Sequence, residues 1–193
     1  DGGSIDGTVR LAESLGARVI HCAPGRARQQ NCGAAVAKGE NLLFLHADTR
    51  LPEGYVSQVF ETLMAPWPVI GAFRFKTDFR TPLMRLVEWV THLRSTYLRR
   101  PYGDQAIFMK KSIFEKAGGF PAVPIAEDLF LVRHLSKHEN VQVAMAPGAV
   151  VTSGRRWKTL GPLKTTWINQ LMLMGMAMGI SLQTLSRLYR RSS

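Results

Sequence analysis

One acidic residue of the sequence stands where a divalent cation could bind. Asp48 follows the apolar run Leu42–Leu45, and His46 lies two residues before it, on the same side of an extended chain. Mg²⁺ and Mn²⁺ need only one or two carboxylates when a diphosphate supplies further oxygens. Asp48, joined by His46, is therefore a candidate metal ligand. A capping role at the helix that follows Pro52 is the alternative explanation of Asp48.

The same stretch also invites comparison with a phosphatase motif. Phosphatases of the haloacid dehalogenase type use D-x-D-x-[TV] after an apolar strand, and the first aspartate is the nucleophile. Here the run is His46-Ala47-Asp48-Thr49, so a histidine stands at the nucleophile position. Because a histidine cannot form the aspartyl-phosphate, the sequence argues against this class of enzyme.

Three further acids are candidates for a general base that removes a proton from a hydroxyl group. Glu127 and Asp128 begin a predicted helix, and Asp104 lies in a turn before a predicted strand. The helix dipole alone also favours acids in a first helical turn. We predict Asp128, Glu127 and Asp104 as catalytic candidates and leave a purely structural role of the pair as the alternative.

Two groups of basic residues could hold a phosphate. Arg26 and Arg28 come just before a predicted helix, where arginines and free backbone N–H groups together favour phosphate. Arg155, Arg156 and Trp157 follow the last predicted strand, and they could clamp a diphosphate beneath an aromatic side chain. A solvated basic loop is the alternative at the first position, and a packed tryptophan beside surface arginines at the second.

The elements that must position these residues alternate between strand and helix through the first two thirds of the chain. The sequence pattern predicts strands at residues 17–22, 41–47, 69–77, 105–111, 141–147 and 149–153. It predicts helices at about residues 7–15, 26–38, 52–64, 82–98, 112–117 and 126–138. This alternation indicates an α/β fold with a Rossmann-like, mostly parallel sheet flanked by helices. Ligands of such sheets bind beyond the carboxyl ends of the strands, where the loops that carry the candidate residues are expected to meet.

The helix expected at residues 82–98 has a pronounced apolar face. Residues spaced by three and four positions share one side of a helix. The members of this face are Leu83, Leu86, Val87, Val90, Leu93 and Tyr97.

Composition narrows the class of protein. The chain has 193 residues, 46% of them hydrophobic, which suffices for one sizeable core and argues against a disordered chain. A net charge of +11 favours anionic partners, namely nucleic acid, an anionic membrane surface or a phosphorylated substrate. The two cysteines, Cys22 and Cys32, fit neither a C-x-x-C redox pair nor a zinc site. We predict them as separate, buried thiols of a reducing cytoplasm.

The C-terminal tail, residues 158–193, is basic and rich in methionine. Its run Trp167–Leu182 is apolar over sixteen residues, whereas a membrane-spanning helix usually needs about 20. Packing against the core is the favoured explanation. Contact with a membrane surface through flanking Lys and Arg residues and a spanning helix are the alternatives.

Taken in order, these pieces resemble a family 2 glycosyltransferase with a GT-A fold. The matching stretches are D-G-G-S-x-D-G-T at 1–8, R-x-x-N-x-G-A at 28–34, GENLLFLHADT at 39–49, GDQAIFMKKSIFEKAGGFP at 103–121 and E-D at 127–128. The wording HADT, GDQAIF and RRW is similar to a bacterial subgroup labelled arsenosugar-biosynthesis-like or selenodomain-associated. The resemblance covers roughly residues 1–157, which we predict as one GT-A domain followed by the helical tail.

The resemblance implies transfer of a hexose-like sugar from a nucleotide-diphosphate donor to an acceptor hydroxyl, with inversion. It implies that Asp1 contacts the nucleotide and that Asp48, as the last acid of the family's D-x-D element, binds Mn²⁺ or Mg²⁺ and the donor diphosphate. Asp128 matches the usual general base. Arg156 and Trp157 match an R-W element near the diphosphate, and Arg28 is expected on the donor as well.

Two departures from the family pattern shape these expectations. The family begins with a strand and an Asn-Glu loop before its D-G-G-S turn, so we expect this chain to lack the first strand of its domain. The first acid of D-x-D is His46 here, which removes one negative charge and makes Mn²⁺ the more plausible cation.

The acceptor is left open between a small molecule and a lipid-linked one. We expect a cytoplasmic protein, with peripheral contact at the inner face of the membrane as a further expectation, and no nucleic-acid partner. A nucleotidyltransferase and a non-enzymatic basic module that binds nucleic acid or membrane are the competing hypotheses.

Overall fold

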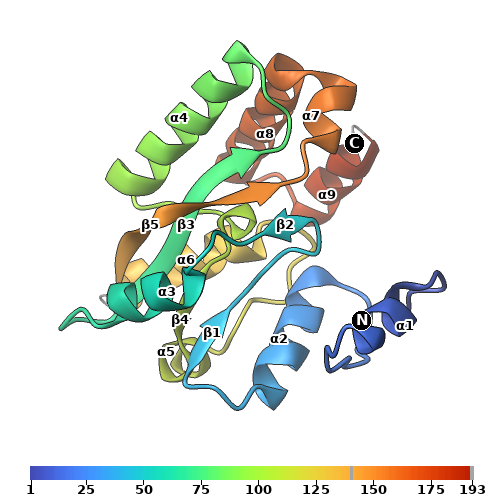
Figure 1. Ribbon diagram of the computed structural model, residues 1–193. Coiled ribbons are helices and arrows are strands. Elements are labelled where there is room, and N and C mark those ends of the chain that lie inside the picture. The colour runs from blue at the N-terminus through green and yellow to red at the C-terminus, as the bar shows by residue number, and fades with distance from the viewer. Residues whose placement is uncertain (140, 192–193) are drawn as a thin grey trace.

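The computed structural model describes residues 1–139 and 141–191 as a mixed α/β fold around one sheet (Figure 1). The sheet has the strand order β1-β4-β3-β5-β2. Its strands are β1 Asn41–Leu43, β2 Thr49–Arg50, β3 Val69–Thr77, β4 Phe108–Lys110 and β5 Gln142–Thr152. The two long strands β3 and β5 form the centre of the sheet and carry most of its pairing.

Helices precede, connect and follow the strands. They are α1 Thr8–Ser14, α2 Arg26–Val36, α3 Tyr55–Leu63, α4 Pro82–Tyr97, the 3₁₀ turn η1 Gly103–Gln105, α5 Lys111–Lys116, α6 Glu127–His138, α7 Arg155–Leu160, α8 Pro162–Ala177 and α9 Leu182–Arg191. Each helix predicted from the sequence is present, with ends that differ by a few residues. Residues 17–22, predicted as a strand, instead form an extended loop, although the amino group of Asp1 donates to Ile20 O at 2.7 Å.

The prediction of a mostly parallel sheet is wrong, because the sheet is mixed. β3 and β5 are parallel, whereas β1 pairs with β4, β4 with β3, and β2 with β5 in antiparallel orientation. Alternation of strands and helices along the chain predicts how many elements there are. It does not reveal whether a short strand such as β4 runs in the same direction as its neighbours or in the opposite one.

Two apolar layers enclose the sheet. On one side α2, α5 and α6 pack against it through a cluster that includes Ile70 and Met109, both fully buried. On the other side α3 packs on a cluster around Phe73 and Phe108, whose rings lie 5.3 Å apart. Since β3 contributes to both clusters, it is the central strand of the core.

The apolar face predicted for α4 is only partly used by the core. Met84 and Ser95 are the buried residues of this helix, and Leu83, Val87 and Leu93 are half-buried. Leu86 and Val90 keep 52% and 51% of their surface exposed. The side of α4 with the strongest apolar pattern therefore leaves a large apolar area uncovered.

The tail forms helices α8 and α9, which lie at the same end of the molecule as α4 and α7 (Figure 1). Leu185 of α9 is 2% exposed and contributes to the interior. Several large side chains of α8 are exposed, among them Leu163, Trp167 and Met174. Among the described residues, no helix combines the length and the apolar character that crossing a membrane requires.

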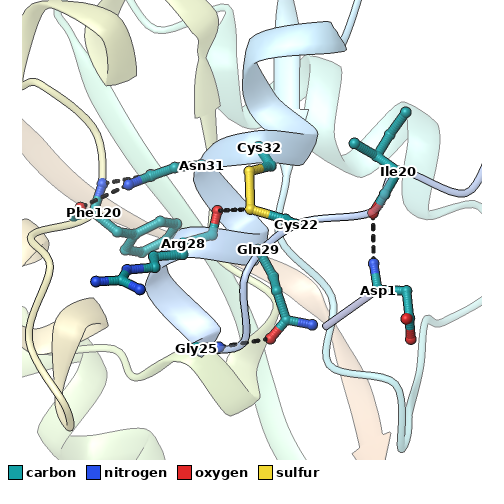
Figure 2. The surroundings of a disulfide bond; sticks show 9 residues. All are labelled: Asp1, Ile20, Cys22, Gly25, Arg28, Gln29, Asn31, Cys32 and Phe120. Carbon is teal, nitrogen blue, oxygen red and sulfur yellow. Dashed lines mark hydrogen bonds between the residues drawn. A yellow bond between two sulfur atoms is a disulfide. The ribbon is translucent and has the colours of Figure 1, made fainter. Parts of the chain in front are cut away.

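The cysteines form a disulfide bond, contrary to the prediction of separate thiols. Cys22, in the loop before α2, is bonded to Cys32 within α2, with 6.5 Å between their Cα atoms (Figure 2). Sequence spacing did not reveal this pairing because the helix brings residue 32 back over the loop that precedes it. The bond fixes the loop that leads to Arg26 and Arg28 against the helix that these arginines begin.

Candidate active site

A cavity of about 310 Å³ lies at one edge of the sheet, and it collects most of the candidate residues. Its walls come from the ends of β1, β3 and β5, the start of α6, and helices α7, α8 and α9. The candidate residues on its lining are His46, Asp48, Asp104, Asp128, Arg156 and Trp157. The sequence therefore identified residues that the fold brings together from segments far apart in the chain.

The antiparallel pairing of β1 and β4 explains how the first of these segments meet. Leu43, at the end of β1, is paired with Phe108, at the start of β4. The residues that follow β1 thus lie beside those that precede β4, which places His46 next to η1. In a parallel pair these segments would lie at opposite ends of the two strands.

Gly103 is the point at which His46 and Asp128 come closest together. A Cβ atom at Gly103 would lie 3.0 Å from Asp128 Oδ2 and 3.0 Å from His46 Nε2. The two side-chain atoms are therefore no more than 6.0 Å apart. A side chain at position 103 would therefore fit only if the imidazole or the carboxylate moved by a few tenths of an ångström.

Gln105, which is fully buried, holds the turn η1 in place. Its side-chain N–H donates to Phe73 O in β3 at 2.9 Å, and its carbonyl oxygen accepts from Ser95 Oγ in α4 at 2.8 Å. A buried amide whose hydrogen bonds reach two other elements ties the turn to both of them. Asp104 is thereby presented to the cavity from a rigid support.

Asp128 stands at the start of α6 with both carboxylate oxygens engaged. Oδ2 accepts the backbone N–H of Gly103, and Oδ1 accepts the N–H of Leu129 at 2.8 Å. Ala126, just before the helix, has a left-handed backbone with φ of +64°, a conformation that is costly for a residue with a Cβ atom. These constraints aim the carboxylate at the cavity, where its remaining lone pairs can accept a proton.

Glu127 has a different environment from its neighbour. It is 2% exposed and forms a two-point ion pair with Arg26, in which Nη2 donates to Oε2 at 3.1 Å and Nε donates to Oε1. Burial lowers the pKa of the Arg26 guanidinium, but the hydrogen bond and charge of Glu127 outweigh it, so the pKa is raised. The pair links α2 to α6.

Asp104 combines burial with an unsatisfied oxygen. Burial raises the pKa of its carboxyl above the ordinary value of 3.8, while the positive charge of Arg94 opposes the shift. Within the described part of the chain, Asp104 Oδ1 is buried and has no hydrogen-bond partner. A protonatable carboxyl with a vacant position is thus available to a group that enters the cavity.

Arg156 supplies positive charge to the lining of the cavity. Its guanidinium carbon lies 4.0 Å from the centroid of the Tyr189 ring, and its Nε and Nη2 atoms are buried without a hydrogen-bond partner among the described residues. Gly154, which donates to Asp78 Oδ1 at 2.7 Å, anchors the start of α7. An arginine with two unpaired nitrogen donors in a fixed position can bind a phosphate or a carboxylate.

The acids of the cavity do not form a closed metal cage. Within residues 1–139 and 141–191, no three His, Cys, Asp or Glu side chains are grouped so that they could hold an ion. Asp48 is exposed at the mouth, and its backbone oxygen accepts the N–H of Ser153 at 2.9 Å. An Mg²⁺ or Mn²⁺ ion at Asp48 and His46 would therefore depend on oxygens from a ligand, and this donor set fits such an ion.

Asp1 and Arg28 lie outside this cavity. Arg28 lines a larger neighbouring cavity of about 720 Å³, which shares Arg26 and Tyr189 with the first. The Asp1 carboxylate accepts the backbone N–H groups of Gly3 and Ser4 at 2.7 and 3.0 Å, so it stabilises its own turn. Neither cavity has Asp1 on its lining.

Sequence reasoning missed several residues of the cavity. Tyr102, whose ring centroid lies 3.7 Å from the guanidinium carbon of Arg94, and Tyr189 both line the cavity, and neither was among the candidates. Burial raises the pKa of the Tyr102 hydroxyl, although Arg94 lowers it. Tyr102 borders the Gly103–Gln105 motif and could have been included on that ground, whereas nothing in the local sequence singles out Tyr189.

Comparison with protein families assigns the chain to a class. The sequence model described as Glycosyl transferase family 2 matches residues 1–123. Because this stretch exceeds half of the 193 residues, the chain belongs to glycosyl transferase family 2. The mixed α/β fold is consistent with a GT-A-like domain. Asp128, Arg156 and Trp157 lie beyond the matched stretch.

Among solved structures, the chain is similar to a mycobacterial protein with a known crystal structure, at a TM-score of 0.50 and 17% identity. The alignment covers 78% of this chain and 52% of the other, so the chain spans about half the length of that protein. A likeness at this identity concerns the fold alone. A comparison with curated proteins gave no match.

Proposed function

We propose that this protein is an inverting glycosyltransferase that moves a sugar from a nucleotide-diphosphate donor to an acceptor hydroxyl. The observation that carries the proposal is a single cavity lined by Asp48, Asp104, Asp128 and Arg156, in which Nε and Nη2 of Arg156 have no hydrogen-bond partner among the described residues. Membership of family 2 supports glycosyl transfer over nucleotidyl transfer or a purely binding role. The similarity to the arsenosugar-type subgroup stays a prediction.

The reaction needs an acid–base group and a place for negative charge. The acceptor oxygen forms a bond to the anomeric carbon while the bond from that carbon to the diphosphate oxygen breaks. The hydroxyl proton passes to a carboxylate, and the electron pair leaves with the nucleoside diphosphate. We assign the base to Asp128, because its oxygens face the cavity and Glu127 is engaged by Arg26.

The donor would extend across both cavities. Its diphosphate would lie against Arg156 and Trp157, and its nucleoside would reach toward Arg28 in the larger cavity. Asp48 and His46 would hold Mn²⁺ or Mg²⁺ beside the diphosphate. When bound, such an ion stabilises negative charge on the leaving group.

A panel of nucleotide sugars tests this function directly. Thermal unfolding and donor hydrolysis would be measured with UDP-, GDP- and TDP-sugars, with and without Mn²⁺. We expect at least one donor to raise the melting temperature. Arg156→Gln should lower the affinity for that donor about 10- to 100-fold, since hydrogen bonds to charged groups contribute about 1.5–3 kcal/mol. Arg155→Gln, at the exposed neighbouring position, is the matched control.

Asp128→Asn separates binding from chemistry. Donor binding should persist, while turnover should fall about 10²- to 10⁴-fold because a positioned base is lost. Unchanged turnover would move the base to Asp104 or Glu127. If no nucleotide sugar stabilised the protein under either condition, the proposed function would be wrong.

We also propose peripheral contact with an anionic membrane surface through α8 and α9. Leu163, Trp167 and Met178 are 71%, 64% and 75% exposed, and basic residues such as Lys164 and Arg187 lie on the same two helices. Apolar side chains beside basic ones are the combination that binds lipid headgroups. This contact would place the protein at the inner face of the membrane.

A further inference from the structure

A third cavity, which the proposed chemistry leaves unused, adjoins the candidate active site. It has a volume of about 390 Å³ and lies between α4 and α8, which are neighbours in the structure (Figure 1). It shares Tyr102, Asp104 and Trp157 with the active-site cavity. A molecule in this groove would therefore reach the carboxylates without crossing the protein interior.

The outer walls of the groove are apolar. Leu86, Val87 and Val90 of α4 face Leu163 and Trp167 of α8. Apolar side chains on one face of an amphipathic helix normally pack against a core. Here that face of α4 lines an open groove, which suits an apolar ligand better than it suits water.

Three polar side chains of the groove carry buried atoms without hydrogen-bond partners among the described residues. These atoms are Arg94 Nε, Asp104 Oδ1 and Thr166 Oγ1. Leaving one such group unpaired costs about 1–3 kcal/mol. The three groups comprise a donor, an acceptor and a hydroxyl that can serve as either, and an incoming hydroxyl group can satisfy a donor and an acceptor at once.

We propose that the groove between α4 and α8 binds the acceptor and that the acceptor is an uncharged hydrophobic alcohol. Its apolar body lies between the two helices, and its hydroxyl reaches the groups beside Asp104. At this end of the groove the positive charge of Arg94 acts on the acidic side chain of Asp104, so the two together offer no net positive charge to a phosphate. The inference rests on the proposed function and names the substrate class of the same site.

The transfer step follows from this placement. The oxygen of the alcohol bonds to the anomeric carbon of the nucleotide sugar, the bond to the diphosphate breaks, and the alcohol proton passes to the Asp128 carboxylate. The products are an alkyl glycoside and a nucleoside diphosphate. The groove holds the alkyl part throughout, so affinity for the alcohol does not require the donor.

Calorimetric titration with 1-octanol tests the groove without any donor, and octyl phosphate serves as the anionic comparison. We expect saturable binding of octanol and at least tenfold weaker binding of octyl phosphate. Val87→Phe fills the groove and should lower the affinity for octanol at least tenfold. Thr166→Val keeps the side-chain shape and removes one hydroxyl, so it should weaken octanol about 3- to 10-fold. Thr159→Val, at an exposed position on α7, should have no effect.

The two failures can be told apart. If the donor panel stabilises the protein but octanol does not bind, or binds Val87→Phe and Thr166→Val as it binds the unmodified chain, the acceptor inference is wrong and the glycosyltransferase proposal stands. Equal binding of octyl phosphate would also overturn the neutral acceptor. If octanol binds the groove and no nucleotide sugar binds, the transferase proposal fails instead.

Discussion

The three aspartates of the cavity differ in surroundings although they share a chemical group. Asp48 is exposed at the mouth, Asp128 is engaged by two backbone N–H groups, and Asp104 has a buried oxygen without a partner among the described residues. The residue types were evident in the sequence, but the surroundings arise only when η1, α6 and β1 meet.

Asp104→Asn is expected to stabilise the protein at neutral pH. Because burial raises the pKa of Asp104 above 3.8, the folded state binds more protons than the unfolded state between the two pKa values. The free energy of unfolding therefore falls as the pH rises through that interval and stays lower above it. The variant lacks this loss, so it should be the more stable form at pH 7.

Urea unfolding at pH 7 and pH 4 measures the effect. The advantage of Asp104→Asn should shrink toward pH 4, where the unfolded aspartate also takes up its proton. An advantage that is the same at both values, or absent at pH 7, would mean that the Asp104 carboxyl is not perturbed by burial.

At the level of elements, the sequence predicted most helices and the central strand but not the direction of the short strands. The pattern of Gly71–Thr77 identified β3, and its alternation is observed from Arg74 to Thr77. The apolar stripe of α4 identified the helix, and the structure shows that Leu86 and Val90 of that stripe stay about half exposed. Periodicity reports which face is apolar; it does not report whether a core or a groove lies opposite.

Gly71 in β3 shows how closely the strands of the core approach each other. It is paired with Phe108 in β4, and a Cβ atom at Gly71 would lie 1.9 Å from Phe108 Cε2. Gly71→Ala should therefore lower the free energy of unfolding by about 1–3 kcal/mol, the usual range for overpacking. Gly33→Ala is the control, because its Cβ would meet nothing within 4 Å in α2 and should raise stability by up to about 1 kcal/mol.

Chemical denaturation of both glycine variants is the measurement. Both changes add one methyl group, so the test is whether they change the free energy of unfolding in opposite directions. A Gly71→Ala variant as stable as the unmodified protein would show that Phe108 can move aside without cost.

The whole molecule carries a net charge of +11, which acts together with the exposed tail helices. If α8 and α9 contact a membrane, binding should require anionic lipid and should weaken as salt screens the charges. We expect flotation with vesicles that contain phosphatidylserine and none with phosphatidylcholine alone. Lys164→Glu should weaken binding several-fold, as each basic residue near the surface contributes about 1 kcal/mol.

Lys38→Glu makes the same charge change at an exposed position that follows α2 and lies outside the tail helices. It should leave flotation nearly unchanged. If both variants lose vesicle binding equally, the net charge of the protein causes the binding and the tail helices have no special part in it. Flotation that ignores both lipid charge and salt would contradict the proposed contact.

The contact of His46, Gly103 and Asp128 has a consequence for how this site can change over time. The three residues come from separate stretches of the chain, yet they share one small volume in which a Cβ atom at Gly103 would touch both side chains. A larger residue at position 103 would force the other two apart, and a smaller residue at position 46 or 128 would leave a gap. We therefore expect the three positions to be inherited as a unit, with replacement of any one tolerated only when another changes with it.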